Sequence, residues 1–291
     1  MSAILGVVFA FAAMLCWGFG DFLIQKSTRK FGDWETMFII TLLSTIVLTP
    51  FLLKKAIILF RTEINSLLIL AAASIILLIA GLLDFEALKQ GKLSVVEPLW
   101  SLEIIVSAII AFFVAGEIIS NMQILTIITL IVGLCMVSLR SYHLSKKVWF
   151  EKGTLVAILA AITMGIANYF TGIGSRSTNA LLAIWFMHGA LMIFSLIYLA
   201  SKKDTKKLFK HIKKNKSFLL CMSTLDTLAW IAFAAAMIYS PIAIAVALSE
   251  SYIVITVLLG MYINKEYLRK HQKIGLVLAI ASAIILAAIT I

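Results

Sequence analysis

Residues 66–89 have the sequence SLLILAAASIILLIAGLLDFEALK, in which no charged side chain occurs before Asp84. A helix that crosses the hydrocarbon layer of a membrane needs about 20 mostly apolar residues. The stretch does not alternate apolar and polar positions, so we expect a spanning helix and not a strand of a membrane β-barrel. This stretch alone predicts an integral membrane protein.

Runs of the same kind recur along the whole chain and predict an all-α fold of about ten transmembrane helices. The first run continues through Phe22 with no Lys or Arg before it, so we expect a retained helix and not a signal peptide. The predicted spans cover approximately residues 4–28, 34–53, 66–89, 94–115, 121–140, 153–175, 179–200, 217–238, 241–263 and 273–291.

The composition excludes an ordinary soluble domain. Of the 291 residues, 62% are hydrophobic and 13% are charged, whereas soluble domains carry about 25% charged residues. The net charge of +11 comes from Lys and Arg residues between the apolar runs. They form no basic stripe with interleaved aromatics, so we expect no nucleic-acid partner. Cys16, Cys135 and Cys221 lie inside apolar runs and are interpreted as small core residues. We expect a multi-pass protein of the plasma membrane.

The positive charges predict an orientation. All but four of the 25 Lys and Arg residues lie on the side that holds the segments after the first, third, fifth, seventh and ninth helices. By the positive-inside rule that side is cytoplasmic and both termini are outside. The richest segment, 201–216, predicts a solvated loop that faces anionic lipid.

The second half of the chain repeats polar landmarks of the first half in the same order. The corresponding pairs are Glu117 and Glu266, Gln123 and Gln272, Asp21 and Asn168, and Arg29 and Arg176. We therefore predict two five-helix repeats, 1–140 and 141–291. Because five helices return the chain on the opposite face, the second repeat is expected to be inverted. Transporters built in this way place the substrate near the midplane between the halves.

Charged and polar residues at the turns are expected to stabilise helix ends. Glu117 and Glu266 each precede the fifth helix of a half, and we expect them to cap or stabilise that helix. Ser120 and Gln123 have the spacing of a capping box.

A Trp-Gly pair, Trp17-Gly18, lies near the middle of the first predicted helix. Gly116-Glu117 precedes a polar turn and then an apolar helix that contains Gly133. In these features the chain resembles the EamA-type branch of the drug/metabolite transporter superfamily, although Lys265 replaces the glycine before Glu266. The resemblance covers essentially the whole chain. It implies a ten-helix exporter or exchanger of amino acids, metabolites or drugs, with a central cavity between the halves.

Polar side chains inside the spans are the candidate site residues. An ionisable side chain at a helix centre costs at least about 2.5–3.5 kcal/mol, so it is expected to face a cavity or a partner. Asp21 lies four residues after Trp17, and Asp226 lies four residues before Trp230, so each acid shares a helix face with an indole ring. The candidates for substrate binding or proton coupling are Trp17, Asp21, Asp84, Trp100, Glu103, Asn168, His188, Asp226, Trp230, Glu250 and Tyr252.

Structural roles compete with these functional ones. Asp21 is expected in a pocket, but an interfacial or paired role is the alternative. His188 is either a packed, hydrogen-bonded residue or a functional group. Gly165 and Gly172 share one face of the sixth helix and predict either a pocket wall or close helix packing.

Two roles for the acids stay open at this stage. Acids bind an ammonium or other cation, assisted by Trp and Tyr faces through cation–π attraction. Alternatively, Glu103, Asp226 or Glu250 carries a proton that couples transport, because a buried carboxyl group without a cationic partner tends to hold a proton.

The sequence as a whole predicts a secondary transporter. It would move a small metabolite, an amino acid or related compound, by alternating access in efflux or exchange. The first, third, fourth, sixth, eighth and ninth helices are expected to line its cavity. We expect no cofactor, no metal and no catalytic residue; a monomer and a homodimer both fit the sequence. The alternatives are an integral membrane enzyme and a lipid-handling protein without transport. Against an enzyme, the chain contains no HExxH, phosphate-loop or GxSxG motif.

Overall fold

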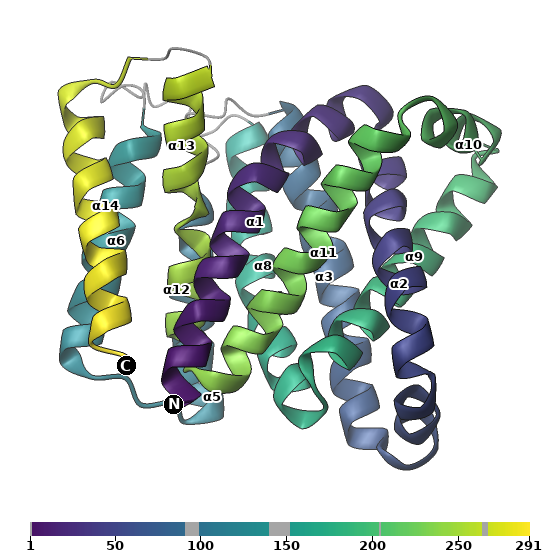
Figure 1. The fold of residues 1–291 in the computed structure, drawn as a ribbon, viewed down its shortest axis with the longest axis horizontal. Helices are drawn as coiled ribbons and strands as arrows, with labels where there is room; N and C mark the ends of the chain where they lie inside the picture. The colour runs from purple at the N-terminus through teal and green to yellow at the C-terminus, as the bar shows by residue number, and fades with distance from the viewer. Residues whose placement is uncertain (1, 91–98, 140–151, 204, 264–266) are drawn as a thin grey trace.

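The computed structural model describes residues 2–90, 99–139, 152–203, 205–263 and 267–291. Nine helices in these ranges are long and apolar enough to span a membrane, with α12 and the start of α13 counted as one, and α5 is a shorter apolar helix. This confirms the predicted all-α membrane fold (Figure 1). The helices are α1 (Ser2–Phe31), α2 (Asp33–Thr62), α3 (Ile64–Gln90), α5 (Leu102–Ala115), α6 (Asn121–Ser138), α8 (Lys152–Ser177), α9 (Ala180–Ser201), α10 (Thr205–Lys214), α11 (Lys216–Tyr239), α12 (Ile242–Glu250), α13 (Tyr252–Ile263) and α14 (Lys270–Ala288).

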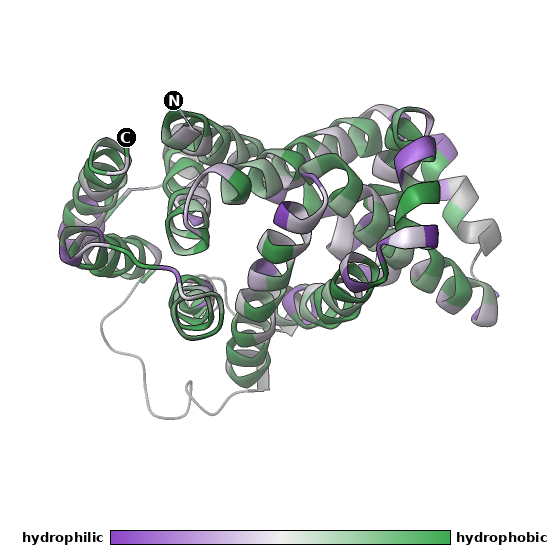
Figure 2. Cartoon of the chain, turned by 90° about the horizontal axis from the view of Figure 1, so that it is seen from below, coloured by the Kyte–Doolittle hydropathy of each residue, from purple (hydrophilic) through white to green (hydrophobic). Residues whose placement is uncertain are grey.

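The outward surface of the helices is apolar. Figure 2 shows hydrophobic residues along most of the bundle, with hydrophilic residues confined to small patches. Phe51 and Phe113 are each 77% exposed, and Val277 is 68% exposed. Large apolar side chains exposed over so much of the surface are expected where lipid, and not water, surrounds the protein.

Helices pair across the two halves of the chain. α1 packs along α11 and α3 packs along α8, so in both cases the first helix of one half contacts the third helix of the other. The pairs α2 with α9 and α6 with α14 join equivalent helices. This pairing is unchanged when the halves are exchanged. In Figure 1, α1 rises from the edge that holds the N-terminus, whereas α8 descends towards that edge. The two repeats are therefore inverted.

The bundle has two edges that differ in charge. Both termini lie at one edge, here named the terminal edge (Figure 1). The opposite edge holds α10 and the end of α1 with Arg29 and Lys30, and it is here named the basic edge. Which edge faces the cytoplasm stays a prediction of the positive-inside rule.

Two glycines bring α6 and α14 together backbone to backbone. A Cβ atom on Gly133 would lie 2.7 Å from the backbone nitrogen of Ala279, and one on Gly275 would lie 2.8 Å from the carbonyl oxygen of Gly133. No larger side chain fits at either position without moving a helix. At the start of α6, Ser120 and Gln123 form the predicted capping box.

Two predictions are wrong, one about the end of a helix and one about a segment between helices. α2 does not stop at residue 53 but continues to Thr62. Lys54 and Lys55 are exposed, while Ala56 and Leu59 remain buried, so an amphipathic extension packs on the bundle beyond the apolar run.

The segment 201–216 is not a solvated loop throughout, because it contains the helix α10. Leu208 of this helix is fully buried. The Nδ1 atom of His211 lies 2.8 Å from Oε2 of Glu35 at the start of α2. These contacts, together with a hydrogen bond from Lys30 Nζ to Asn215 Oδ1 at 2.9 Å, fold a lysine-rich segment onto the basic edge.

Candidate functional site

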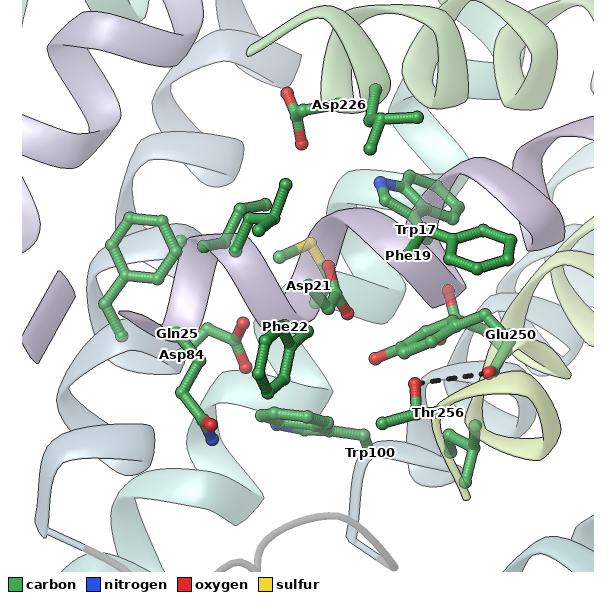
Figure 3. Close-up of a pocket in the computed structure, with 18 of the residues that line it drawn as sticks. Trp17, Phe19, Asp21, Phe22, Gln25, Asp84, Trp100, Asp226, Glu250 and Thr256 are labelled. Atoms are coloured by element: carbon green, nitrogen blue, oxygen red, sulfur yellow. Dashed lines mark hydrogen bonds between the residues drawn. The ribbon is translucent and has the colours of Figure 1, made fainter. Parts of the chain in front are cut away.

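A cavity of about 690 Å³ lies between the two halves (Figure 3). Small-molecule sites typically have volumes of about 300–1,000 Å³. The residues of α1 that line the cavity lie between Trp17 and Gln25, and those of α11 lie between Cys221 and Trp230. Both segments lie between the middle of their helix and its end at the basic edge. The cavity therefore occupies the centre of the bundle and the half next to the basic edge.

Every residue predicted as a site candidate lines this cavity. They come from both halves of the chain, and their roles stay predictions. They are Trp17, Asp21, Asp84, Trp100, Glu103, Asn168, His188, Asp226, Trp230, Glu250 and Tyr252.

Aromatic rings form one wall of the cavity. The centroids of the Trp17 and Trp230 rings are 5.3 Å apart, and the planes meet edge to face at 87°. Phe233 supports Trp17 from the core at 5.1 Å, and Tyr252 lies 6.4 Å from Trp17. Edge-to-face contacts fix the ring planes, so α1 and α11 together hold the two indoles in place.

His188 lies behind this wall. Its ring meets the ring of Trp230 edge to face at 6.0 Å, and only 2% of the residue is exposed. Its Nδ1 atom makes no hydrogen bond. His188 therefore packs against the aromatic wall and borders the cavity, and its role as a functional group stays a prediction. Among the described residues, no group of three His, Cys, Asp or Glu side chains has the arrangement of a metal site.

Asp226 lies next to the indoles of Trp17 and Trp230. In Figure 3 the nitrogen-bearing edge of the Trp17 ring is turned towards Asp226. The residue is 5% exposed, and its Oδ2 atom makes no hydrogen bond of good geometry. A buried carboxylate oxygen without a donor costs free energy, which marks this position as one that a ligand can satisfy.

Asp21 is the electrostatic centre of the cavity. Its carboxylate interacts with the Tyr252 hydroxyl. Its charge also acts on each of the other four carboxyl groups of the lining, Asp84, Glu103, Asp226 and Glu250. Figure 3 shows Asp21 directed from α1 into the space between Trp17, Asp84 and Glu250.

Glu103 connects the two halves. Asn168 of α8 donates a hydrogen bond from Nδ2 to Glu103 Oε2, 3.3 Å away, and both side chains are buried. The approach is close because a Cβ atom on Gly165 would lie 2.6 Å from Cβ of Val106. A Cβ atom on Gly172 would likewise meet Ile242 at 2.8 Å. Gly165 and Gly172 therefore serve close helix packing, and neither borders the cavity.

The ninth predicted helix, 241–263, is not continuous, and this is a further correction. A turn at Ser251 separates α12 from α13, with the Ser251 amide bonded to the carbonyl of Leu248 at 3.3 Å. The cavity residues Glu250 and Tyr252 flank the turn. Thr256 donates to the Tyr252 carbonyl (Figure 3, dashed line). A similar turn at Ser101 precedes Glu103 in the first half. Interrupted helices at the midplane are common at transporter substrate sites.

Part of the lining was not predicted from the sequence. The second, fifth and seventh predicted helices also contribute, for example through Met37, Val137 and Leu191, and so does Gln272, just before the tenth predicted span. Apolar residues such as Met37 give no signal, because core-facing and cavity-facing positions have the same composition. Gln272 is polar and matches Gln123 in the repeat, but it lies outside the predicted spans. In the structure its Nε2 donates to the Val137 carbonyl at 2.9 Å.

An ion pair joins the two halves of the chain at the terminal edge. Arg176 Nη1 lies 2.6 Å from Glu117 Oε1, and the same guanidinium donates to the carbonyl oxygens of Met237 and Ser240. The other oxygen of Glu117 accepts the backbone N–H of Ile242 at 2.8 Å. Glu117 therefore caps α12 of the second half, and the prediction that it caps the next helix is wrong. Glu266 lies outside the described residues.

Comparison with known proteins identifies the family. The sequence model of the EamA-like transporter family matches residues 4–139 and 151–288. No curated protein matches the chain. A solved structure described as "Crystal structure of protein" is similar with a TM-score of 0.73 and 14% sequence identity, over 96% of this chain and 94% of that chain. This likeness shows the fold alone. Because the family match covers nearly all of both halves, the chain belongs to the EamA-like transporter family.

Proposed function

We propose that this protein is a secondary carrier that moves a small metabolite by alternating access through the central cavity. The family makes it a membrane transporter of the drug/metabolite superfamily. One observation carries the finer proposal. The cavity lies towards the basic edge, while Glu117 and Arg176 join the two halves at the terminal edge. A site that is next to one edge and sealed from the other is what one state of an alternating-access cycle requires.

The inverted pairing of the helices supports the other half of the cycle. Because the helix pairs are equivalent on exchange of the two halves, each half can adopt the conformation of the other. That exchange would open the cavity to the terminal edge and close it at the basic edge. With the basic edge in the cytoplasm, the described state receives cargo from the cytoplasm. This favours efflux or exchange. The cargo is a small metabolite, an amino acid or a related compound such as an amine. One of the cavity acids would carry any coupling proton.

Cys221 offers a test that needs no knowledge of the substrate. It is exposed and lines the cavity, whereas Cys16 and Cys135 are only partly exposed and do not line it. In a variant with Cys16→Ser and Cys135→Ser, a membrane-impermeant maleimide is applied from each side of sealed vesicles. We expect Cys221 to react from the basic side.

The same vesicles separate a carrier from a channel. Simultaneous, equally fast labelling from both sides would contradict a carrier and indicate an open pore. The triple variant that also carries Cys221→Ser gives the background.

A further inference from the structure

We propose that the cargo is an organic cation, an amine or quaternary ammonium compound whose charge binds at Asp21 among the aromatic rings of the cavity. This inference rests on the proposed function, since it takes the cavity to be the transport site. It narrows the cargo from metabolites in general to those with a positive charge and an apolar body.

The charges of the lining have one sign. Five carboxyl groups border the cavity, and none of its described lining residues is Lys or Arg. Away from bulk water, charge interactions are strong. An anion would meet five acids and no Lys or Arg among the described lining residues, and the carboxylate of a zwitterionic amino acid would likewise lack such a partner. A cation alone finds opposite charge and lowers the repulsion among the acids.

Asp21 is the best-placed of the five acids to meet the charge of the cargo. Asp21 and Asp84 are half-buried, whereas Asp226, Glu103 and Glu250 are at most 6% exposed. The charge of Asp21 reaches each of the other four acids, so a cation bound there is attracted by the whole cluster. Figure 3 shows its carboxylate directed into open space.

Asp226 gives an independent sign of a missing ligand. It is 95% buried, since only 5% of the residue is exposed, and its Oδ2 atom makes no hydrogen bond of good geometry. The indoles of Trp17 and Trp230 sit beside it. The indole N–H groups interact with this carboxyl group, and a protonated amine would add a charged donor at Oδ2, with a charge that matches the acid.

The aromatic rings suit the body of such a compound. Trp17, Trp100, Trp230 and Tyr252 all border the cavity, and Figure 3 shows Phe22 and Trp100 on the side of Asp21 away from Asp226. Ring faces attract cations, and quaternary ammonium groups are commonly bound in aromatic cages. The volume of about 690 Å³ leaves room for apolar substituents on the nitrogen.

The test compares ligands that differ only in charge. The full-length protein, purified in detergent, is titrated with choline and with 3,3-dimethyl-1-butanol, a neutral compound of the same shape. Benzyltrimethylammonium, phenylalanine and benzoate complete the set. Binding is followed by quenching of Trp fluorescence and by the shift of the unfolding temperature. We expect both quaternary cations to bind, with the benzyl compound tighter, and the neutral, zwitterionic and anionic compounds to bind at least about tenfold more weakly.

Variants of the protein then test whether the cation binds at Asp21. Asp21→Asn should weaken binding of benzyltrimethylammonium at least about tenfold, and Asp21→Glu should restore part of it. The matched control is Glu63→Gln, because Glu63 is an exposed acid outside the cavity, and it should leave the affinity unchanged. Equal binding of choline and its neutral analogue, or full affinity in Asp21→Asn, would overturn the proposal.

Proteoliposomes loaded with radiolabelled choline separate this inference from the proposed function. Release of choline that requires the protein and is lost in Asp21→Asn supports both. Transport of phenylalanine or benzoate without any transport of choline would refute the cation and leave the carrier standing. Cation binding without transport of any compound of the set would refute the carrier and with it the transport role of the site.

Discussion

Arg176 and Glu117 form an ion pair between the two halves of the chain, with Nη1 2.6 Å from Oε1. The pair does more than neutralise charge, because Glu117 also caps α12 and Arg176 also binds two carbonyl oxygens at the end of α11. These two side chains together thus hold the ends of α5, α8 and α11 at the terminal edge.

Glu117→Gln should destabilise the described state, in which the two halves are joined at the terminal edge. The amide keeps the size of the side chain and an acceptor for the Ile242 N–H but loses the charge. We expect the free energy of unfolding to fall by about 1–2 kcal/mol, measured as a lower unfolding temperature in detergent. The control is Arg61→Gln, at an exposed arginine at the end of α2, with an expected change within about 0.5 kcal/mol. Equal losses in the two variants would show that the pair contributes nothing specific.

The same substitution should open the terminal edge. Ser240 is 5% exposed, and its hydroxyl makes no hydrogen bond, so Ser240→Cys is a conservative reporter in a chain without other cysteines. We expect slow labelling of this cysteine from the terminal side, and faster labelling when Glu117→Gln is added. Unchanged labelling would mean that the ion pair does not close this edge.

Gly133→Ala should destabilise the protein although alanine is the better helix former. The added Cβ would lie 2.7 Å from the Ala279 backbone, and such overpacking costs about 1–3 kcal/mol. Gly189→Ala is the control, because its Cβ would meet only Thr45, at 3.9 Å. We expect that change to be neutral or to stabilise by up to about 1 kcal/mol. Thermal unfolding of both variants decides the prediction, and a stable Gly133→Ala protein would contradict it.

His211→Ala should loosen α10 from the basic edge. The substitution removes the contact with Glu35 at 2.8 Å and the ring contact with Phe31 at 4.8 Å. Trypsin should then cleave within the lysine-rich segment 201–216 faster, because proteolysis needs local unfolding. Ser217→Ala, at an exposed position just beyond α10, should leave the rate unchanged. Equal rates in the two variants would mean that the buried Leu208 and the hydrogen bond from Lys30 to Asn215 hold the helix without His211.

The spans, and the gathering of the candidate residues around one cavity, could be predicted from the sequence because both follow from the cost of polar groups in lipid. Asp21, Asp84 and Glu103 stand out within apolar runs, and so do Asp226 and Glu250. An acid in such a run is costly to expose to lipid, so it is expected to face the interior of the bundle or a cavity. For that reason all five line one cavity in the structure.

The features that could not be predicted from the sequence depend on contacts between distant segments. The turn at Ser251 is formed within a run that is continuous in composition, and only the polar triplet Ser249-Glu250-Ser251 hints at it. The cap of α12 by Glu117 joins residues 125 positions apart, which no local pattern encodes. α10 forms because Leu208 finds a buried place, although the segment around it is strongly polar.

The cross-pairing of the helices has a consequence for the synthesis of the chain. α1 and α3 are made first, but their partners, α11 and α8, belong to the second half. Until these arrive, Asp21, Asp84 and Glu103 stand in the bilayer without the residues that enclose them in the finished protein. The newly synthesised first half is therefore an incomplete intermediate, and we expect chaperones or the translocon to shield it until the second half is made. A premature stop between the halves would leave a fragment marked for degradation, and not a half-active carrier.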